Sequence, residues 1–224
     1  MNLDKRALTP NDICEMQNEL NTIIDSNWVE NRNKDDFLTQ IIDELAEFLG
    51  SGIEYKWWKH TPEDQFNLHN ARIELVDIVH FAASICIMSE GEPNKKPIRI
   101  SGNDRLIVDG NKINFKMYSW LVQCLVNLLD SFEPQSQLEY IIGLMCSGTY
   151  MSVAEFSALY VCKYNLNIIR QDQGYKSGEY VKVQDGVEDN ERLKRVVEDF
   201  MENEDMMLAD IKDKVWGEFF QKVA

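Results

Sequence analysis

The feature that most constrains this chain is a pair of acids inside its most apolar segment. Residues 71–88 read ARIELVDIVHFAASICIM, and between Ile73 and Phe81 apolar side chains would occupy every side of a helix. Glu74 and Asp77 therefore cannot both reach water without exposing part of that apolar surface. Because an unpaired buried carboxylate costs several kcal/mol or becomes protonated, the fold must supply a partner for these acids.

A second acidic pair lies on the preceding predicted helix. Glu44 and Glu47 are three residues apart, as are Glu74 and Asp77, so each pair shares one helix face. Antiparallel packing would bring the four carboxylates together, and a hard divalent cation with oxygen ligands would remove the cost of burying them. The residues alone also allow two simpler interpretations. The first pair could lie on a solvated face, and the second could form a buried salt bridge with Arg72.

Apolar spacing and capping signals predict an all-α helical bundle. Thr9 is a typical N-cap residue followed by Pro10 at the first helical position, and Thr61 and Pro62 repeat this pattern. The predicted helices cover about 10–25, 34–49, 61–88, 115–130, 134–147, 152–170, 188–201 and 204–221. Within 98–115 an Asp-Gly turn joins two β-prone runs, which predicts a small β-hairpin insertion.

Length and composition exclude several classes of protein. One domain over 1–224 is expected, with a mobile helical part around 90–150. The net charge of −15 argues against a nucleic-acid-binding protein, which would present a basic face. Charged residues in the apolar segment would be costly in lipid, so we expect a core helix and no membrane partner. Five cysteines without a C-x-x-C pair, and no apolar leader, indicate a cytoplasmic protein with reduced thiols.

A basic stripe follows in the second half of the chain. Lys163, Asn167 and Arg170 are spaced to share one helix face, and Tyr175 and Lys182 come from the glycine-bearing loop that follows. Lysine and arginine both bind phosphate, the first as a point charge and the second as a planar fork. A solvated helix face balanced by the many acids is the alternative.

Polar and aromatic residues complete the candidate set. Gln17 and Asn21 lie one turn apart, and side-chain amides can read the edge of a base. Trp57 and Trp58 offer flat faces for stacking. His80 follows the second acidic pair, although a satisfied core histidine is the alternative interpretation.

The order of these motifs resembles the dimeric dUTPases, an all-α pyrophosphohydrolase family unrelated to the β-rich trimeric dUTPases. The first half carries Q-x-x-L-N at 17–21, E-L-A-E at 44–47, Y-K-W-W-K at 55–59 and E-L-V-D-I-V-H-F at 74–81. The second half carries K-x-x-x-N-x-x-R-Q at 163–171, G-Y-K at 174–176, Y-x-K at 180–182 and E-D-N at 188–190. Each motif is weak alone, and their ordered series over about 17–82 and 160–195 is specific.

The resemblance implies a role for each matching position. The Mg²⁺ ligands would be Glu44, Glu47, Glu74 and Asp77, with Mn²⁺ as an alternative ion. The contacts to uracil and deoxyribose would be Gln17, Asn21, Trp57, Trp58, His80 and Asn190. The phosphate contacts would be Lys59, Lys163, Asn167, Arg170, Tyr175 and Lys182. The family also implies a homodimer.

The function implied is magnesium-dependent hydrolysis of dUTP to dUMP and pyrophosphate. Water would attack the α-phosphorus, with Glu44 or Glu47 accepting the proton. Such a dUTP diphosphatase limits uracil incorporation into DNA and supplies dUMP. One alternative is a phage-type pyrophosphatase that also accepts dCTP, with dUDP as a further substrate. Another is a non-catalytic nucleotide-sensing module that binds proteins. The presence of all four acids favours an enzyme.

Overall fold

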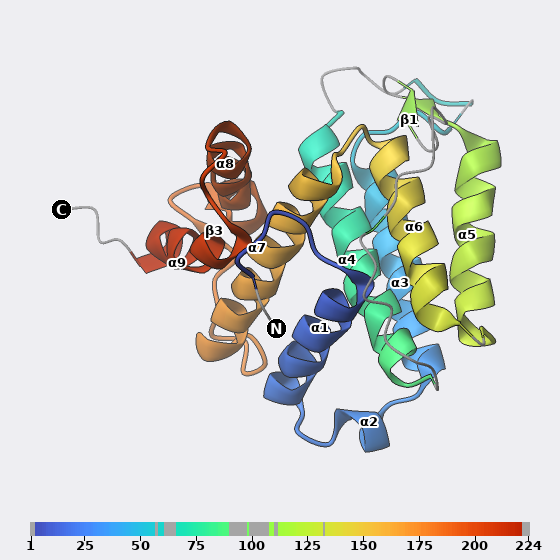
Figure 1. Ribbon diagram of the computed structural model, residues 1–224. Coiled ribbons are helices and arrows are strands. Elements are labelled where there is room, and N and C mark those ends of the chain that lie inside the picture. Colours follow the sequence, from blue (N-terminus) through green and yellow to red (C-terminus); the bar gives the residue numbers. More distant parts are fainter. Residues whose placement is uncertain are drawn as a thin grey trace.

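The computed structural model describes residues 3–56, 58–60, 66–89, 98, 108–109, 112–131 and 133–220 of the chain. Helices dominate it (Figure 1), which confirms the predicted all-α architecture. The elements are α1 (Pro10–Ile24), α2 (Trp28–Asn31), α3 (Lys34–Gly50), α4 (Leu68–Ile87), β1 (Val108–Asp109), β2 (Lys112–Ile113), α5 (Phe115–Leu129), α6 (Pro134–Gly148), α7 (Val153–Asp172), β3 (Val183–Gln184), β4 (Val187–Glu188), α8 (Asp189–Glu202) and α9 (Ile211–Phe220).

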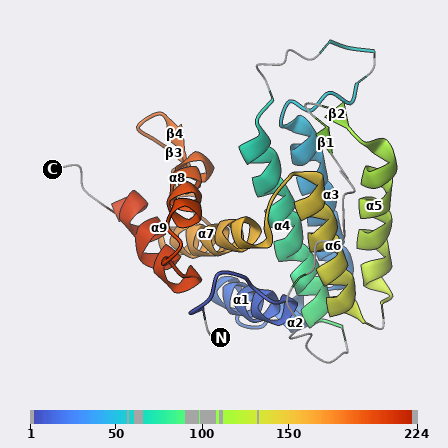
Figure 2. The same cartoon turned by 45° about the horizontal axis from the view of Figure 1, so that its top comes forward.

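Helix α4 lies at the centre of the bundle. Helix α3 packs along it, and α1, α6 and α7 also contact it. Helix α5 lies outside α6, while α8 and α9 pack on α7 at the opposite side of the molecule (Figures 1 and 2). Most of α4 is buried, including Glu74 among its apolar neighbours. Within the described part of the chain, no helix is long and apolar enough to cross a membrane.

The capping residues explain where the first long helices begin. Thr9 accepts a hydrogen bond from the Asp12 backbone, and the Asp12 side chain accepts one in return, which forms a capping box at α1. Asn33 and Asp36 form the same arrangement at α3. Helix α4 begins later than predicted, at Leu68, because the side chain of Asn67 caps it. The predicted cap at 61–62 lies outside the described residues.

Two small hairpins interrupt the helices in the part of the chain that the structure describes. Strands β1 and β2 pair antiparallel inside the predicted 98–115 insertion. Strands β3 and β4 form a second hairpin, which we did not predict, inside the glycine-bearing loop. Its turn residues Asp185 and Gly186 have φ angles of 54° and 76°, and Asp-Gly is a favoured pair for such a turn. The last predicted helix also starts later, at Ile211, after a 3₁₀ turn at Leu208–Asp210.

The N-terminal segment fastens the C-terminal helices to the bundle. Arg6 donates to the backbone carbonyls of Phe200, Asn203 and Met206 at the end of α8. The backbone N–H of Leu208 donates to the Lys5 carbonyl. The same N-terminal segment contacts α7, where Ser157 Oγ accepts from the Leu8 backbone N–H. It thereby links the end of α8 to α7, and α8 begins at the candidate site.

Candidate active site

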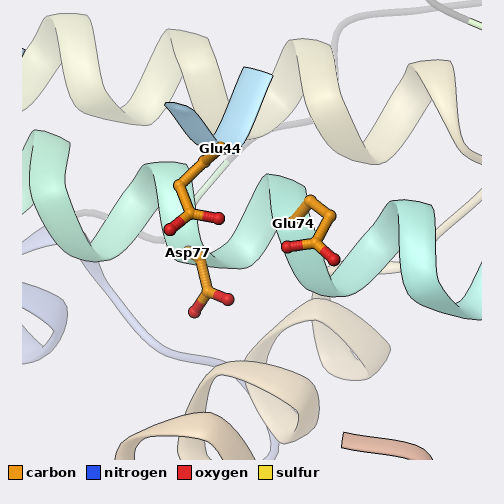
Figure 3. A group of neighbouring side chains, drawn as sticks. All are labelled: Glu44, Glu74 and Asp77. Carbon is orange, nitrogen blue, oxygen red and sulfur yellow. The ribbon is translucent and has the colours of Figure 1, made fainter. Parts of the chain in front are cut away.

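Three carboxyl groups from two helices meet beside α4. Glu44 projects from α3, and Glu74 and Asp77 project from α4 (Figure 3). One ligand oxygen of each lies within 4.8 Å of those of the other two. Asn70 donates to Glu74 Oε1 at 2.9 Å. Glu47 is exposed and lines the same pocket, outside this acidic trio.

Burial and mutual repulsion raise the pKa of two members of the trio. Burial is the largest cause for Glu44, followed by the charges of Asp77, Glu74 and Glu47, and together they raise its pKa to about 9. Burial and the charge of Asp77 raise the pKa of Glu74 to about 7. Such a cluster holds protons unless a cation neutralises it, and clustered carboxylate oxygens suit Mg²⁺ and Mn²⁺. The trio therefore fits a hard divalent cation.

Lys163 of α7 supplies a buried positive charge next to the trio. Its side chain is 2% exposed, its Nζ lies 2.8 Å from Asp77 Oδ2, and it donates to Asn190 Oδ1 at 3.0 Å. Arg72 instead pairs with Glu155 at 2.8 Å. The interpretation of the α4 acids as a salt bridge to Arg72 is therefore wrong. One lysine against three carboxyl groups leaves net negative charge for a cation to neutralise.

The basic stripe of α7 is held by the start of α8. Arg170 Nε and Nη2 donate to the carboxylate of Asp189 at 2.9 and 2.8 Å, and Nη1 donates to Asn167 Oδ1 at 3.1 Å. The Tyr175 ring centroid lies 5.8 Å from the Arg170 guanidinium and 5.8 Å from Lys182 Nζ. Because Lys163 and Arg170 are both buried, a solvated helix face is the wrong description of this stripe.

A closed chain of hydrogen bonds fixes the polarity of the amide groups. The Gln17 amide nitrogen donates to Asn21 Oδ1, the Asn21 amide nitrogen donates to Ser84 Oγ, and the Ser84 hydroxyl donates to the His80 carbonyl. Gln17 Oε1, 2.6 Å from His80 Nδ1, must then accept the imidazole proton. The imidazole stacks on Tyr160 at 4.2 Å, and burial lowers the pKa of His80 to about 4. His80 is thus neutral, and its Nε2 is an acceptor with no partner in the described part of the structure.

A pocket of about 410 Å³ connects the acidic, basic and amide groups. The predicted residues that line it are Gln17, Asn21, Glu44, Glu47, Glu74, Asp77, His80, Lys163, Asn167, Arg170, Tyr175, Lys182 and Asn190. Trp58 is 65% exposed, and neither it nor Lys59 lines this pocket. Trp57 lies outside the described residues.

Several lining residues were absent from the sequence prediction. Gln40 and Asp43 line the pocket from α3, one turn before Glu44 and Glu47. Helical spacing alone could have identified them, because residues four apart share a face. Phe81 also lines the pocket and supplies an apolar surface beside the amide groups.

The raised pKa values predict that the metal-free protein loses stability as pH rises from 7 to 8. An unfolded glutamate releases its proton near 4.5, whereas Glu44 keeps its proton up to about pH 9. The folded state therefore binds more protons than the unfolded state, and stability falls as pH rises. Burial lowers the pKa values of His69 and His80, so both imidazoles are already neutral throughout this window.

Thermal unfolding with a chelator measures this effect. We expect the melting temperature to fall by roughly 2–4 °C between pH 7 and 8, and Mg²⁺ to stabilise the protein more at the higher pH. A Glu44→Gln variant should show a flatter dependence. A wild-type melting temperature that rises over this interval would contradict the assignment.

Comparison with known proteins identifies the family of this chain. The sequence model of the dUTPase family matches residues 10–175, which contain the acidic trio, the amide groups and the basic stripe of α7. A search of curated proteins gives no match. The helical architecture agrees with the family match. The chain therefore belongs to the all-α dUTPase family and is a dUTP diphosphatase, an enzyme that hydrolyses dUTP.

Proposed function

We propose that this pocket hydrolyses dUTP to dUMP and pyrophosphate with Mg²⁺, through attack of water on the α-phosphorus. The observation that carries the proposal is the acidic trio on α3 and α4, which lies beside the buried cations of α7. A nucleoside triphosphate bound to a divalent cation needs negative ligands for the ion and positive groups for its phosphates. Both are present within one pocket.

On the acidic side, Glu44, Glu74 and Asp77 would hold the cation. When bound, the ion supplies charge neutralisation for phosphate oxygens and lowers the pKa of water. Glu47 lines the pocket one helical turn from Glu44 but lies outside the trio. We therefore assign it as the group that accepts the proton of the attacking water.

On the basic side, the buried cations would bind the triphosphate. Lys163 offers a point charge close to the trio, and Arg170 offers a planar guanidinium farther along α7. Lys182 and Tyr175 approach from the loop between α7 and α8. As pyrophosphate leaves, these groups would stabilise its developing charge.

The fixed polarity of the amide groups supports uracil as the preferred base. Uracil presents N3–H as a donor between two carbonyl acceptors, whereas cytosine presents N3 as an acceptor. His80 Nε2 is buried in the free protein. Once a base reaches it, this acceptor would suit the first pattern and repel the second. Because Gln17 holds the proton on Nδ1, the imidazole cannot reverse this preference without breaking the hydrogen-bonded chain.

We therefore expect a strong preference for dUTP over dCTP. Pyrophosphate release should be measured for each canonical nucleoside triphosphate and for dUTP, with and without Mg²⁺. The kcat/KM for dUTP should exceed that for dCTP by about 100-fold or more, since a site built to hydrogen-bond one base leaves polar groups unpaired with another. His80→Leu should lower kcat/KM for dUTP far more than for dCTP. Equal kcat/KM values would favour the phage-type dCTP/dUTP alternative, and nucleotide binding without pyrophosphate release would favour a sensor.

We also propose that the enzyme acts as a homodimer. Helix α5 exposes large apolar side chains, with Phe115 55%, Trp120 47% and Val126 46% exposed. Apolar surface of this kind is stabilised when a second protein covers it. Light scattering at micromolar concentration should give twice the chain mass of 26.1 kDa. A monomer mass at that concentration would rule out the dimer.

A further inference from the structure

Asp189 forms an ion pair with Arg170, one of the basic residues that line the pocket. It is the first residue of α8 and its side chain is 1% exposed. Arg170 lines the pocket, whereas Asp189 does not. We propose that Asp189 is a positioning residue that holds the Arg170 guanidinium in place for the leaving pyrophosphate. This inference rests on the proposed function, because it assigns Arg170 to the phosphates.

The contacts of Asp189 use both of its carboxylate oxygens. Oδ1 accepts from Arg170 Nη2 at 2.8 Å, and Oδ2 accepts from Arg170 Nε at 2.9 Å. This two-point contact fixes the plane of the guanidinium as well as its position. Oδ2 also accepts from the Tyr180 hydroxyl at 2.9 Å. Asp189 therefore joins α7, α8 and the loop between them at one carboxylate.

The remaining contacts of Arg170 leave a defined edge for a ligand. Nη1 donates to Asn167, and Nη2 also approaches Asn190 Oδ1 at 3.4 Å. Among the described residues, one N–H of Nη1 is left without a partner. Asp189 thus holds the Nε–Nη2 edge of the guanidinium, and the remaining Nη1 N–H is left to donate to a ligand.

The charge balance explains why a carboxylate is needed at this position. Burial alone would raise the pKa of Asp189, but hydrogen bonds and charge from Arg170, with help from Tyr180, hold it below its usual value. Asp189 therefore stays ionised and neutralises Arg170 within the protein. Asp77 is the next acid whose charge acts on Arg170. Without Asp189, the guanidinium would be drawn toward the acidic trio and away from the phosphate side of the pocket.

A double-mutant cycle on the full-length protein tests this role. Pyrophosphate binding in the presence of Mg²⁺ is measured by calorimetry for wild type, Asp189→Asn, Arg170→Ala and the double variant, with dUMP as the comparison ligand. Asp189→Asn should weaken pyrophosphate binding by about tenfold, the value of a charged hydrogen bond, and leave dUMP affinity within about twofold. In the Arg170→Ala background, Asp189→Asn should cause no further loss, because the residue it positions is gone.

Other outcomes would overturn the proposal. Losses that multiply in the double variant, or an equal loss of dUMP affinity, would make Asp189 a general structural residue. Failure of the wild type to bind pyrophosphate would remove the ligand that Arg170 is proposed to hold, and would overturn the proposal as well. If Asp189→Asn does not fold, Tyr180→Phe serves as the second variant, because it removes one contact to the same carboxylate. It should weaken pyrophosphate binding by a smaller factor than Asp189→Asn. Unchanged pyrophosphate binding by Tyr180→Phe would contradict the proposal. Turnover of dUTP by the wild type tests the proposed function separately, because calorimetry does not depend on catalysis.

Discussion

Glu74→Gln is expected to abolish magnesium-dependent hydrolysis of dUTP while the helical fold is kept. The substitution removes a charged oxygen ligand from the acidic trio and keeps the shape of the side chain. We expect turnover to fall by about 1,000-fold or more, since stabilisation of phosphate charge is among the largest contributions to this kind of catalysis. Magnesium affinity, measured by calorimetry, should fall with it.

The same variant should gain stability in the absence of metal. Glu74 is 4% exposed and its pKa is raised to about 7, so at pH 8 its charge destabilises the metal-free fold. Its melting temperature with a chelator at pH 8 should therefore equal or exceed that of the wild type. Glu30→Gln, on the exposed surface of α2, is the matched control and should change neither property. Near-normal turnover of Glu74→Gln would show that the trio does not hold the catalytic metal.

Glu47→Gln is expected to separate proton transfer from metal binding. If Glu47 accepts the proton of the attacking water, its amide analogue should lower kcat by roughly 100-fold to 10,000-fold. Magnesium affinity should change only a few-fold, because Glu47 lies outside the acidic trio. Steady-state kinetics and calorimetry on the same preparation measure both quantities. A normal kcat would indicate that Glu44 accepts the proton of the attacking water. A loss of magnesium affinity as large as the loss in kcat would indicate that Glu47 is a metal ligand instead.

Local signals in the sequence were sufficient to predict most helices. Thr9 and Pro10 mark the start of α1 because capping depends on residues only three positions apart. The predicted start of α4 was wrong because Asn67, a capping residue of equal quality, lies closer to the apolar run. The β3–β4 hairpin was missed although Asp185-Gly186 is the same kind of turn pair that marked the 98–115 insertion, because the glycine-bearing segment was interpreted as a loop.

The candidate site shows a similar division between local and long-range information. Glu74 and Asp77 could be singled out because their apolar neighbours on the same helix leave no solvated side. The pairing of Lys163 with Asp77 could not be predicted, since it depends on how α7 crosses α4. Asp189 belongs to the E-D-N motif at 188–190 but received no role for the same reason: its partners lie on another helix and in a loop.

The most direct test of the account is hydrolysis of dUTP in oxygen-18 water, followed by mass spectrometry of both products. We expect no pyrophosphate release with a chelator, release on addition of Mg²⁺, and heavy oxygen in the phosphate of dUMP alone. This pattern requires a cation and attack on the α-phosphorus. Heavy oxygen in the pyrophosphate, or release that persists without a divalent cation, would contradict the assignment of this pocket.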